Sequence, residues 1–393
     1  MSLHSLEFAA DPHAAYDDMR RRHGPLVPVE ITADVPATLV IGYREALHIL
    51  GDPAHFPADP RAWQATVPEH CPVLPMTEWR PTGSKTLGED HSRHRAAYTA
   101  TLDKIDLYAL RHAVEAIAVP LINSFCETGS ADLLGQYAVP LTVRVLNDLL
   151  GFTPEAGQEV FAALVALRDA ADAASAERDD QRFTSAISDV VAAKRAAPGA
   201  DVISWLTGHP AQFDDAEIVA QTAMLYATGT EPTWNLIVNT VLLMVTDDQF
   251  HDELLGGALS IRDAIDEVLF TDPPLANFCS RFPRQPQIIG DSWLPVHQPV
   301  VISLAACNED PAIGGDRTGN RSHLAWGAGP RSCPAQSVAM VIVQEALDQL
   351  LDALPDIELA VPTDHLQWRL GAFHRAPTAV PVIFPPAPPL TFV

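Results

Sequence analysis

The chain has 393 residues, of which 47% are hydrophobic, and its 50 acidic and 25 basic side chains give a net charge of −25. This negative charge argues against nucleic acid or an anionic membrane as the main partner. The longest apolar run, LIVNTVLLMV, is too short and too polar to span a bilayer, and MSLHSLEFAADPH does not resemble a signal peptide. Five scattered cysteines without C-x-x-C spacing favour a reducing cytoplasm over a disulfide framework or a zinc site.

The predicted elements form one mainly α domain with small β-sheets over residues 1–393, because no repeat or low-complexity linker divides the chain. DPHAAYDDMRRRHG predicts a helix closed by Gly24, followed by strands in LVPVEI and ATLVIGY and a helix in REALHIL. Residues 52–90 read as a long irregular loop, and long loops are often functional. Residues 91–270 are almost entirely helical in pattern. Beyond Pro273 we expect short strands in QIIG and PVVISLA, and a hairpin in the tail LQWRLGAFHRAPTAVPVIF.

Residues 214–248 predict one long apolar helix, about 50 Å at about 1.5 Å per residue, with Asp214 as its N-cap. ATGTEP in its middle is a poor helix sequence, because Pro232 has no N–H for the Thr228 carbonyl and Gly229 adds freedom on the same turn. We expect the helix to open there and leave a polar notch near Thr230, Glu231 and Thr233. The alternative is a core helix that is merely kinked.

The stretch HLAWGAGPRSCPAQSVAM places Cys333 in a Gly/Pro turn just before a helix predicted from Ala335 to Leu354. Free N–H groups at a helix start favour a thiolate, which is a metal ligand, over a thiol. A buried structural cysteine is the alternative. A zinc or iron–sulfur site is disfavoured because no second cysteine lies near Cys333 in the sequence.

Together these residues resemble the cytochrome P450 superfamily in its soluble bacterial form, whose haem loop runs Phe-x-x-Gly-x-x-x-Cys-x-Gly. Here the motif positions hold Trp326, Gly329, Cys333 and Ala335. The resemblance implies the cytochrome P450 fold, a single triangular prism. It also implies haem b, with Cys333 as axial iron ligand and Trp326 packed beneath the ring. It places Gly327, Gly329 and Ala335 in the haem loop and Arg331 on a haem propionate.

Other family segments occur in the expected order over essentially the whole chain. HSRHR matches His-x-x-x-Arg, which makes His91 and Arg95 propionate partners, and such charge-assisted bonds are strong. Arg281 lies fourteen residues before Pro295, the spacing of another propionate arginine and a strand-opening proline. DPHAAY near the start and the closing LQWRLGAFHRAPTAVPV also resemble the family's terminal segments.

Two positions depart from the family pattern. The Glu-x-x-Arg ion pair is reduced to Glu267 with Phe270 in place of the arginine, so Glu267 must be solvated, protonated or paired elsewhere, and Arg284 is a possible partner. In the central helix Glu231 follows Gly229 and Thr230, but Pro232 stands at the position of the alcohol that normally helps to deliver protons.

Thr233 points about 100° further round the helix than Pro232 and is a doubtful substitute for that alcohol. Three routes stay open: water carries the protons, the substrate supplies a hydroxyl or amide, or peroxide enters already protonated. Glu231 favours the route that uses oxygen and electrons, because the family members that use peroxide place an arginine beside the proline.

The resemblance implies a ferredoxin and a ferredoxin reductase as electron donors, with docking over the cysteine side. The net charge of −25 would hinder an acidic ferredoxin unless that face is locally basic. We expect such a face from the cations around the helix after His91; the alternative is an ordinary solvated helix. These cations are Lys85, Arg93, Arg95, Lys104 and Arg111.

The substrate is expected above the haem, walled by residues 58–90, the central helix and the segment after Pro274. Aromatic, weakly polar walls favour an aromatic or peptide-like small molecule over a fatty acid. For each tryptophan, core packing is the alternative. The candidates are Trp63, Gln64, Trp79, Ser84, Ala227, Phe278 and Ser280.

These features predict a haem-thiolate oxidase or monooxygenase acting on a small aromatic natural product, and resemble actinobacterial secondary-metabolism members. Oxidative C–C or C–N coupling of a tryptophan-containing cyclic dipeptide is one hypothesis, because coupling needs only hydrogen or electron abstraction. Ordinary hydroxylation is the second, and a haem-binding protein without turnover is the third.

Overall fold

The computed structural model describes residues 2–67, 71, 73–170, 172–247, 250, 256–315, 317 and 319–391. The described part is mainly helical. Its first helices are α1 (Leu6–Ala10), α2 (Pro12–His23), α3 (Tyr43–Gly51), α4 (Arg61–Gln64), α5 (Leu74–Thr77), α6 (Gly88–Leu102), α7 (Leu107–Asn123) and α8 (Val139–Leu150). The later ones are α9 (Pro154–Arg168), α10 (Ala173–Ala196), α11 (Val202–Thr207), α12 (Asp215–Thr246), α14 (Ile261–Thr271), α15 (Leu304–Asn308) and α16 (Gln336–Ala353). Single turns of 3₁₀ or π-helix are η1 (Leu134–Ala138), η2 (Pro311–Ile313), η3 (Gly329–Arg331) and η4 (Thr363–His365).

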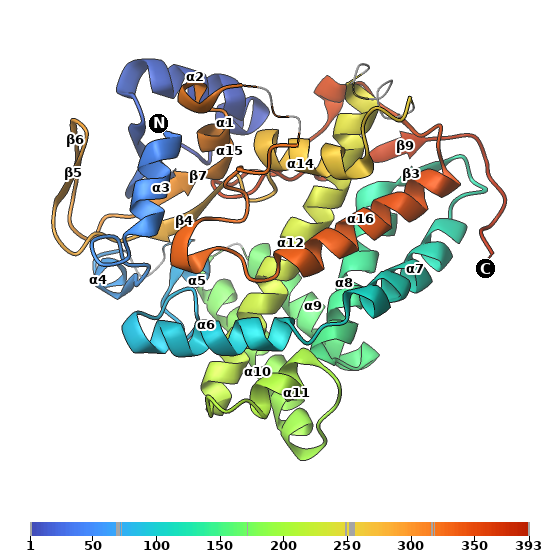
Figure 1. Ribbon diagram of the computed structural model, residues 1–393, viewed down its shortest axis with the longest axis horizontal. Coiled ribbons are helices and arrows are strands. Elements are labelled where there is room, and N and C mark those ends of the chain that lie inside the picture. The colour runs from blue at the N-terminus through green and yellow to red at the C-terminus, as the bar shows by residue number, and fades with distance from the viewer. Residues whose placement is uncertain are drawn as a thin grey trace.

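The strands form three small sheets, of which the largest contains the N-terminal strands and one near the C-terminus packs against the main helical core (Figure 1). The largest has the order β1-β2-β7-β4, in which only the β2–β7 pair is parallel. In this sheet β7 lies between β2 and β4, so β4, which ends at Arg281, joins the N-terminal strands β1 and β2. The strands are β1 (Leu26–Thr32), β2 (Val35–Val40), β3 (Ser130–Asp132), β4 (Asn277–Arg281), β5 (Gln287–Ile289), β6 (Ser292–Leu294), β7 (Val300–Ser303), β8 (Glu358–Leu359) and β9 (Pro381–Ile383).

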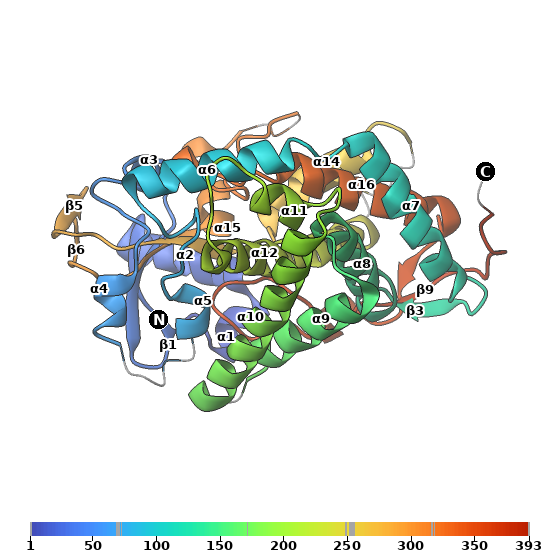
Figure 2. The same cartoon turned by 90° about the horizontal axis from the view of Figure 1, so that it is seen from below.

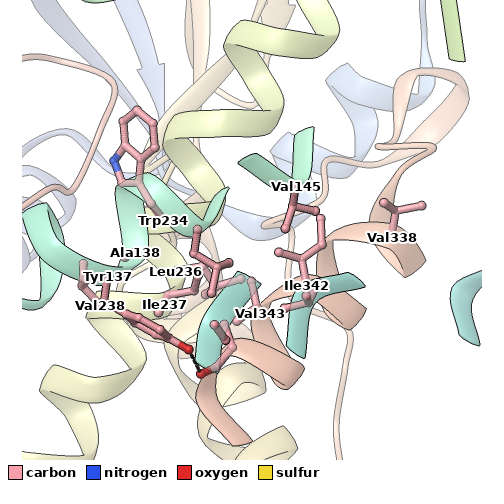
Figure 3. Packing of buried hydrophobic residues seen from close by; sticks show 14 of the residues in the cluster. Tyr137, Ala138, Val145, Trp234, Leu236, Ile237, Val238, Val338, Ile342 and Val343 are labelled. Carbon is pink, nitrogen blue, oxygen red and sulfur yellow. Dashed lines mark hydrogen bonds between the residues drawn. The ribbon is translucent and has the colours of Figure 1, made fainter. Parts of the chain in front are cut away.

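Helix α12 runs through the middle of the molecule, crossed by α16 and flanked by α8 and α10 (Figures 1 and 2). The main hydrophobic core fills the space between these helices, and Figure 3 shows its side chains from η1, α8, α12 and α16 packed together. Within it the Tyr137 hydroxyl donates to the Ala346 carbonyl at 2.5 Å, which satisfies the polar end of a fully buried ring.

The expected break in the central helix is wrong, because α12 continues as one helix from Asp215 to Thr246 with Pro232 inside it. Its predicted start is confirmed: the Asp214 side chain accepts from the Glu217 N–H, and the Glu217 side chain accepts in return from the Asp214 N–H. Almost every side chain of α12 is buried from Thr230 onwards. This burial explains why the helix continues, since tertiary packing can hold a helix through one missing hydrogen bond.

Most other predicted elements are confirmed within a few residues. Gly24 closes α2 with a φ of +72°, and the predicted helix after Cys333 is α16. The loop 52–90 is irregular except for α4, α5 and the start of α6, and its residues 68–70 and 72 lie outside the described part. In the tail, the Thr378 N–H donates to Gln367 and the Arg369 N–H to Ala376, which forms the expected hairpin.

Pro295 does not open a strand as expected, because it follows β6 and β7 begins only at Val300. The helices of the described residues include none that is long and apolar enough to cross a membrane.

Candidate functional site

The loop that presents Cys333 is a tight turn that depends on two glycines. Gly327 and Gly329 both have a φ of +69°, and the Cys333 N–H donates to the Trp326 carbonyl at 2.7 Å. A Cβ on Gly329 would lie 2.6 Å from the Leu50 carbonyl oxygen. The loop therefore packs directly on the end of α3 and places the sulfur three residues before α16.

The expected preference of Cys333 for a thiolate does not hold for the protein alone. Burial raises the pKa of the Cys333 thiol, and the Ala335 N–H and the Arg95 guanidinium oppose this effect without reversing it. Cys333 and Ala335 are both partly exposed as residues, so the loop is not packed entirely into a core. A bound metal cation would itself favour the thiolate.

A group of basic side chains lies beside this loop. Arg331 donates to the Gly83 carbonyl at 2.7 Å and approaches His91 Nδ1 at 2.7 Å, while Arg95 donates to the Ser332 carbonyl. Within the part of the chain that the structure describes, Arg281 donates to the carbonyls of Cys279 and Ser280 alone. The structure thus brings together all four residues predicted to hold propionates.

These cations face one another without a carboxylate partner among the described residues. Burial and the nearby Arg281 lower the pKa of Arg331 to about 10, and burial with repulsion from Arg281 and Arg331 lowers that of Lys85 to about 8. Burial and Arg331 also lower the pKa of His91. The buried Arg331 Nε has no hydrogen-bond partner. Two carboxylates placed here would relieve this repulsion, so the residues fit a haem with its two propionates.

Trp326 precedes this loop, half-buried against the main core, and its indole Nε1 has no partner. The middle of α12 has an accessible face, although most of the helix from Thr230 onwards is buried. Thr228 is exposed in mid-helix, Ala227 beside it is partly exposed, and so are Met224 and Pro232 one turn before and after it. Positions spaced by three, four and eight residues share a helix face, so these residues form one accessible face of α12.

The polar side chains of the predicted notch are buried and do not lie on this accessible face. Thr230 is 0% exposed and its hydroxyl donates to the Tyr226 carbonyl at 2.8 Å, while Thr233 is 6% exposed. The adjacent Gly229 lies against Leu146 of α8. The notch is therefore reduced to the accessible face around Thr228 and Pro232, with Glu231 beside it.

Glu231 is 9% exposed and forms an ion pair with Arg369 of the C-terminal hairpin. Burial alone would raise the pKa of the Glu231 carboxyl, but His374, Arg369 and Arg168 outweigh it and hold that pKa below its usual value. Burial lowers the pKa of His374, and Glu231 opposes this effect. Arg168 in turn pairs with Asp169, which leaves the cluster without excess charge.

The predicted substrate residues separate into two groups. Ser84 lies at the accessible face, because its hydroxyl contacts Met224 Sδ at 3.1 Å, and Ala227 lies on that face itself. Trp63 instead packs in a core cluster against Phe282, with ring centroids 5.6 Å apart. This agrees with core packing, the alternative given above for each tryptophan.

The remaining candidates lie on the loop and on β4. The Gln64 side chain accepts from the Trp79 N–H at 3.0 Å, and Arg61 lies over the Trp79 ring. Phe278 and Ser280 are partly exposed on β4, on either side of Cys279, which has a φ of +57°.

The expected basic docking face is wrong. Arg93 pairs with Glu217 and Arg111 with Glu345, so both are neutralised by acids of neighbouring helices. Lys104 lies over the Trp205 ring, and Lys85 points inward to the Thr77 carbonyl. Of these five cations, Arg95 is the one that lines the groove of about 610 Å³ between α6 and Pro330. The other side chains of that groove are uncharged, apart from His91 and Asp103.

Glu267 finds its partner in Arg317, at 3.1 Å, and not in Arg284. Arg317 also binds Glu309 at 2.6 Å and lies over the Phe270 ring. The His323 ring packs against Phe270 in a T-shaped arrangement. Sequence reasoning missed Arg317, Arg369 and His374, because each meets its partner across at least 50 residues of chain. The only available signal was the unmatched charge of Glu267.

A cysteine in a Gly/Pro turn, beside cations that lack acidic partners among the described residues, is an arrangement that suits a haem held through a thiolate. No family model matches the chain. Among curated proteins, it is 26% identical over 392 residues to cytochrome P450 107B1 of Saccharopolyspora erythraea, covering 95% of each chain. It is 29% identical over 313 residues to the mycinamicin IV hydroxylase/epoxidase of Micromonospora griseorubida, covering 75% of this chain and 78% of that one.

Among solved structures, CYP154A1 of Streptomyces coelicolor A3(2) superimposes with a TM-score of 0.88 at 23% identity, over 98% of this chain and 100% of that one. The chain has the cytochrome P450 fold, and the bacterial proteins that it resembles in sequence are named cytochromes P450 and hydroxylases, which are oxidoreductases. That class implies a haem cofactor.

Proposed function

We propose that the protein is a haem-thiolate monooxygenase or oxidase that modifies a small aromatic natural product, with Cys333 as axial ligand of haem b. The observation that supports it most is the Cys333 loop beside the unpaired cations Arg95, Arg281 and Arg331. The name of the mycinamicin hydroxylase/epoxidase supports a natural-product substrate and ordinary monooxygenation.

When bound, the haem supplies the activation of oxygen. The protein's own residues then have separate tasks. Cys333 would hold the iron, with its thiolate stabilised by the Ala335 N–H and Arg95, and His91, Arg95, Arg281 and Arg331 would bind the propionates. Glu231 holds a proton-accepting carboxylate beside the accessible face of α12.

A neutral aromatic substrate suits this site better than a fatty acid. Arg369 and Arg168 are already paired with Glu231 and Asp169, so neither is free to anchor a carboxylate. Oxidative C–C or C–N coupling of a tryptophan-containing cyclic dipeptide stays one hypothesis and hydroxylation the other. Product mass separates them, since dehydrogenative coupling adds no oxygen.

We propose a ferredoxin and its reductase as electron donors, with docking at the groove lined by His91, Arg95, Thr99, Asp103 and Pro330. Pro330 belongs to the Cys333 loop, so a carrier seated there is near the metal ligand. A haem protein without turnover is the competing function, and it would consume no reductant in response to substrate.

The test is the visible spectrum of the reduced protein under carbon monoxide, recorded for the wild type and Cys333→Ser. A long-wavelength Soret band that disappears in the variant supports the proposal. A spectrum typical of histidine-ligated haem, unchanged in the variant, contradicts it.

A further inference from the structure

The segment from Thr82 to Thr86 forms a turn that binds the Arg331 side chain. Arg331 donates to the Gly83 carbonyl at 2.7 Å and to the Thr86 carbonyl at 2.5 Å. The Thr82 carbonyl closes the turn, because it accepts from the N–H groups of Lys85 and Thr86 at 3.0 and 2.9 Å. In the sequence, Lys85 stands between the two residues whose carbonyls bind Arg331. The turn therefore holds Lys85 beside the loop that contains Arg331.

The Lys85 side chain points inward from this turn. Its ammonium donates to the Thr77 carbonyl at 3.2 Å, and an ammonium has three N–H groups to satisfy. Burial and the charges of Arg281 and Arg331 lower the pKa of Lys85 to about 8. Lys85 is thus within electrostatic range of both arginines. Three segments distant in sequence therefore bring one cation each to the same place.

The carboxylates near Lys85 already have partners. Asp59 and Glu78 lie within electrostatic range of the Lys85 ammonium. Asp59 pairs with Arg61 at 2.6 Å, and Glu78 pairs with Arg80 at 2.6 Å. Among the described residues Lys85 itself forms no ion pair, although a buried ammonium is costly unless an anion neutralises it. The group of cations around Lys85 therefore suits an anionic ligand.

We propose that Lys85 is a further haem-binding residue, whose ammonium pairs with one propionate of the haem. This inference rests on the proposed function. Two carboxylates brought beside Arg281, Arg331 and Lys85 would supply the anions that these cations lack, and such charge-assisted contacts are strong. Lys85 lies outside the sequence motifs that indicated the four other cations of the site.

Loss of haem from the ferric holoenzyme to excess apomyoglobin is the first test. We expect Lys85→Met to lose haem at least about tenfold faster than the wild type at pH 7, because a charge-assisted contact is removed. Lys85→Arg, which keeps the charge, should lose haem at nearly the wild-type rate. The matched control is Lys104→Met, since Lys104 is an exposed lysine that lies over the Trp205 ring. Equal rates in Lys85→Met and this control overturn the proposal.

The pH dependence of haem loss separates an effect of charge from an effect of packing. The pKa of Lys85 is about 8, and a propionate beside it would raise that value. Wild-type haem loss should therefore accelerate as the pH rises above 8 and the ammonium loses its proton. Lys85→Arg should not share this acceleration, because arginine keeps its charge. The nearby Cys279 thiol and His91 imidazole are present in both proteins, so an equal pH dependence in the two overturns the proposal.

Haem dimethyl ester tests whether the propionates are the partners of Lys85. Both carboxylates of this haem are blocked and uncharged, so the wild type and Lys85→Met reconstituted with it should lose it at equal rates. Faster loss of the ester from Lys85→Met would mean that Lys85 acts through packing, and it would overturn the proposal.

The carbon monoxide spectrum of the wild type reports separately on the proposed function. A wild type that lacks the long-wavelength Soret band contradicts that function, whatever Lys85→Met does to haem loss. A wild type that shows the band, but whose haem loss Lys85→Met leaves unchanged, overturns this inference alone.

Discussion

His323 is a buried side chain whose charge state affects stability. Burial lowers its pKa from 6.5 to about 4, the effect of Asp266 opposing it only in part, and its Nδ1 has no partner. Between pH 6.5 and about pH 4, His323 is therefore protonated in the unfolded chain but neutral in the folded chain.

We expect the free energy of unfolding to fall by about 2–3 kcal/mol from His323 as pH drops from 6.5 to 4. His323→Leu should flatten that part of the profile, which urea unfolding at a series of pH values measures. An unchanged profile would mean that other groups dominate acid unfolding.

Arg317 is the second residue whose role follows from contacts distant in sequence. It joins Glu267 of α14 to Glu309 and covers the Phe270 ring. All three charged groups are about one-third exposed, so solvent weakens each pair. We expect Arg317→Leu to lower the free energy of unfolding by about 1–2 kcal/mol.

Glu267→Gln added to Arg317→Leu should recover part of that loss, because the unpaired carboxylate is then removed. Thermal unfolding of the single and double variants measures the coupling. Equal stability of the wild type and Arg317→Leu would show that the network contributes nothing.

The Cys333 turn is an element in which backbone conformation and close packing act together. Gly329→Ala would force a Cβ into the Leu50 carbonyl at a φ of +69°, so we expect a loss of at least about 2 kcal/mol and less bound haem. Gly290→Ala is the control, since Gly290 also has a positive φ but open space around it. Haem content and denaturant unfolding are measured for both, and equal effects would mean that packing on Leu50 is unimportant.

Helix α12 contains Pro232, which lowers the stability of the helix because it removes one backbone hydrogen bond. Pro232→Thr restores a backbone donor for the Thr228 carbonyl, so we expect the free energy of unfolding to rise by about 1–3 kcal/mol. The new alcohol should also raise the fraction of consumed reductant that appears in product. A more stable variant with unchanged coupling would show that the position is only structural.

For the whole molecule, the relevant quantity is the net charge of −25 without a basic docking face. Repulsion of an acidic ferredoxin is then not offset locally. We expect its reduction rate to rise as ionic strength increases from about 0.01 to 0.1 M, because the screening length shortens from about 30 to 10 Å. Stopped-flow reduction measures it, and a rate that falls with salt would reveal complementary charge at the interface.

The order of helices and strands, the N-cap at Asp214 and the turn around Cys333 could be predicted from the sequence. Each depends on residues within a few positions of one another, where propensity, capping and glycine conformation act. The cations His91, Arg95, Arg281 and Arg331 could be grouped only by resemblance, since nothing local joins them.

Tertiary structure alone decided the rest. It kept α12 unbroken through Pro232, paired Glu267 with Arg317, turned Arg93 and Arg111 toward acids, and set Arg369 and His374 beside Glu231. The sequence by itself determined which local structures form, including the turn that presents Cys333. The partners of each buried charge depend on desolvation, which exists only once distant segments have packed together.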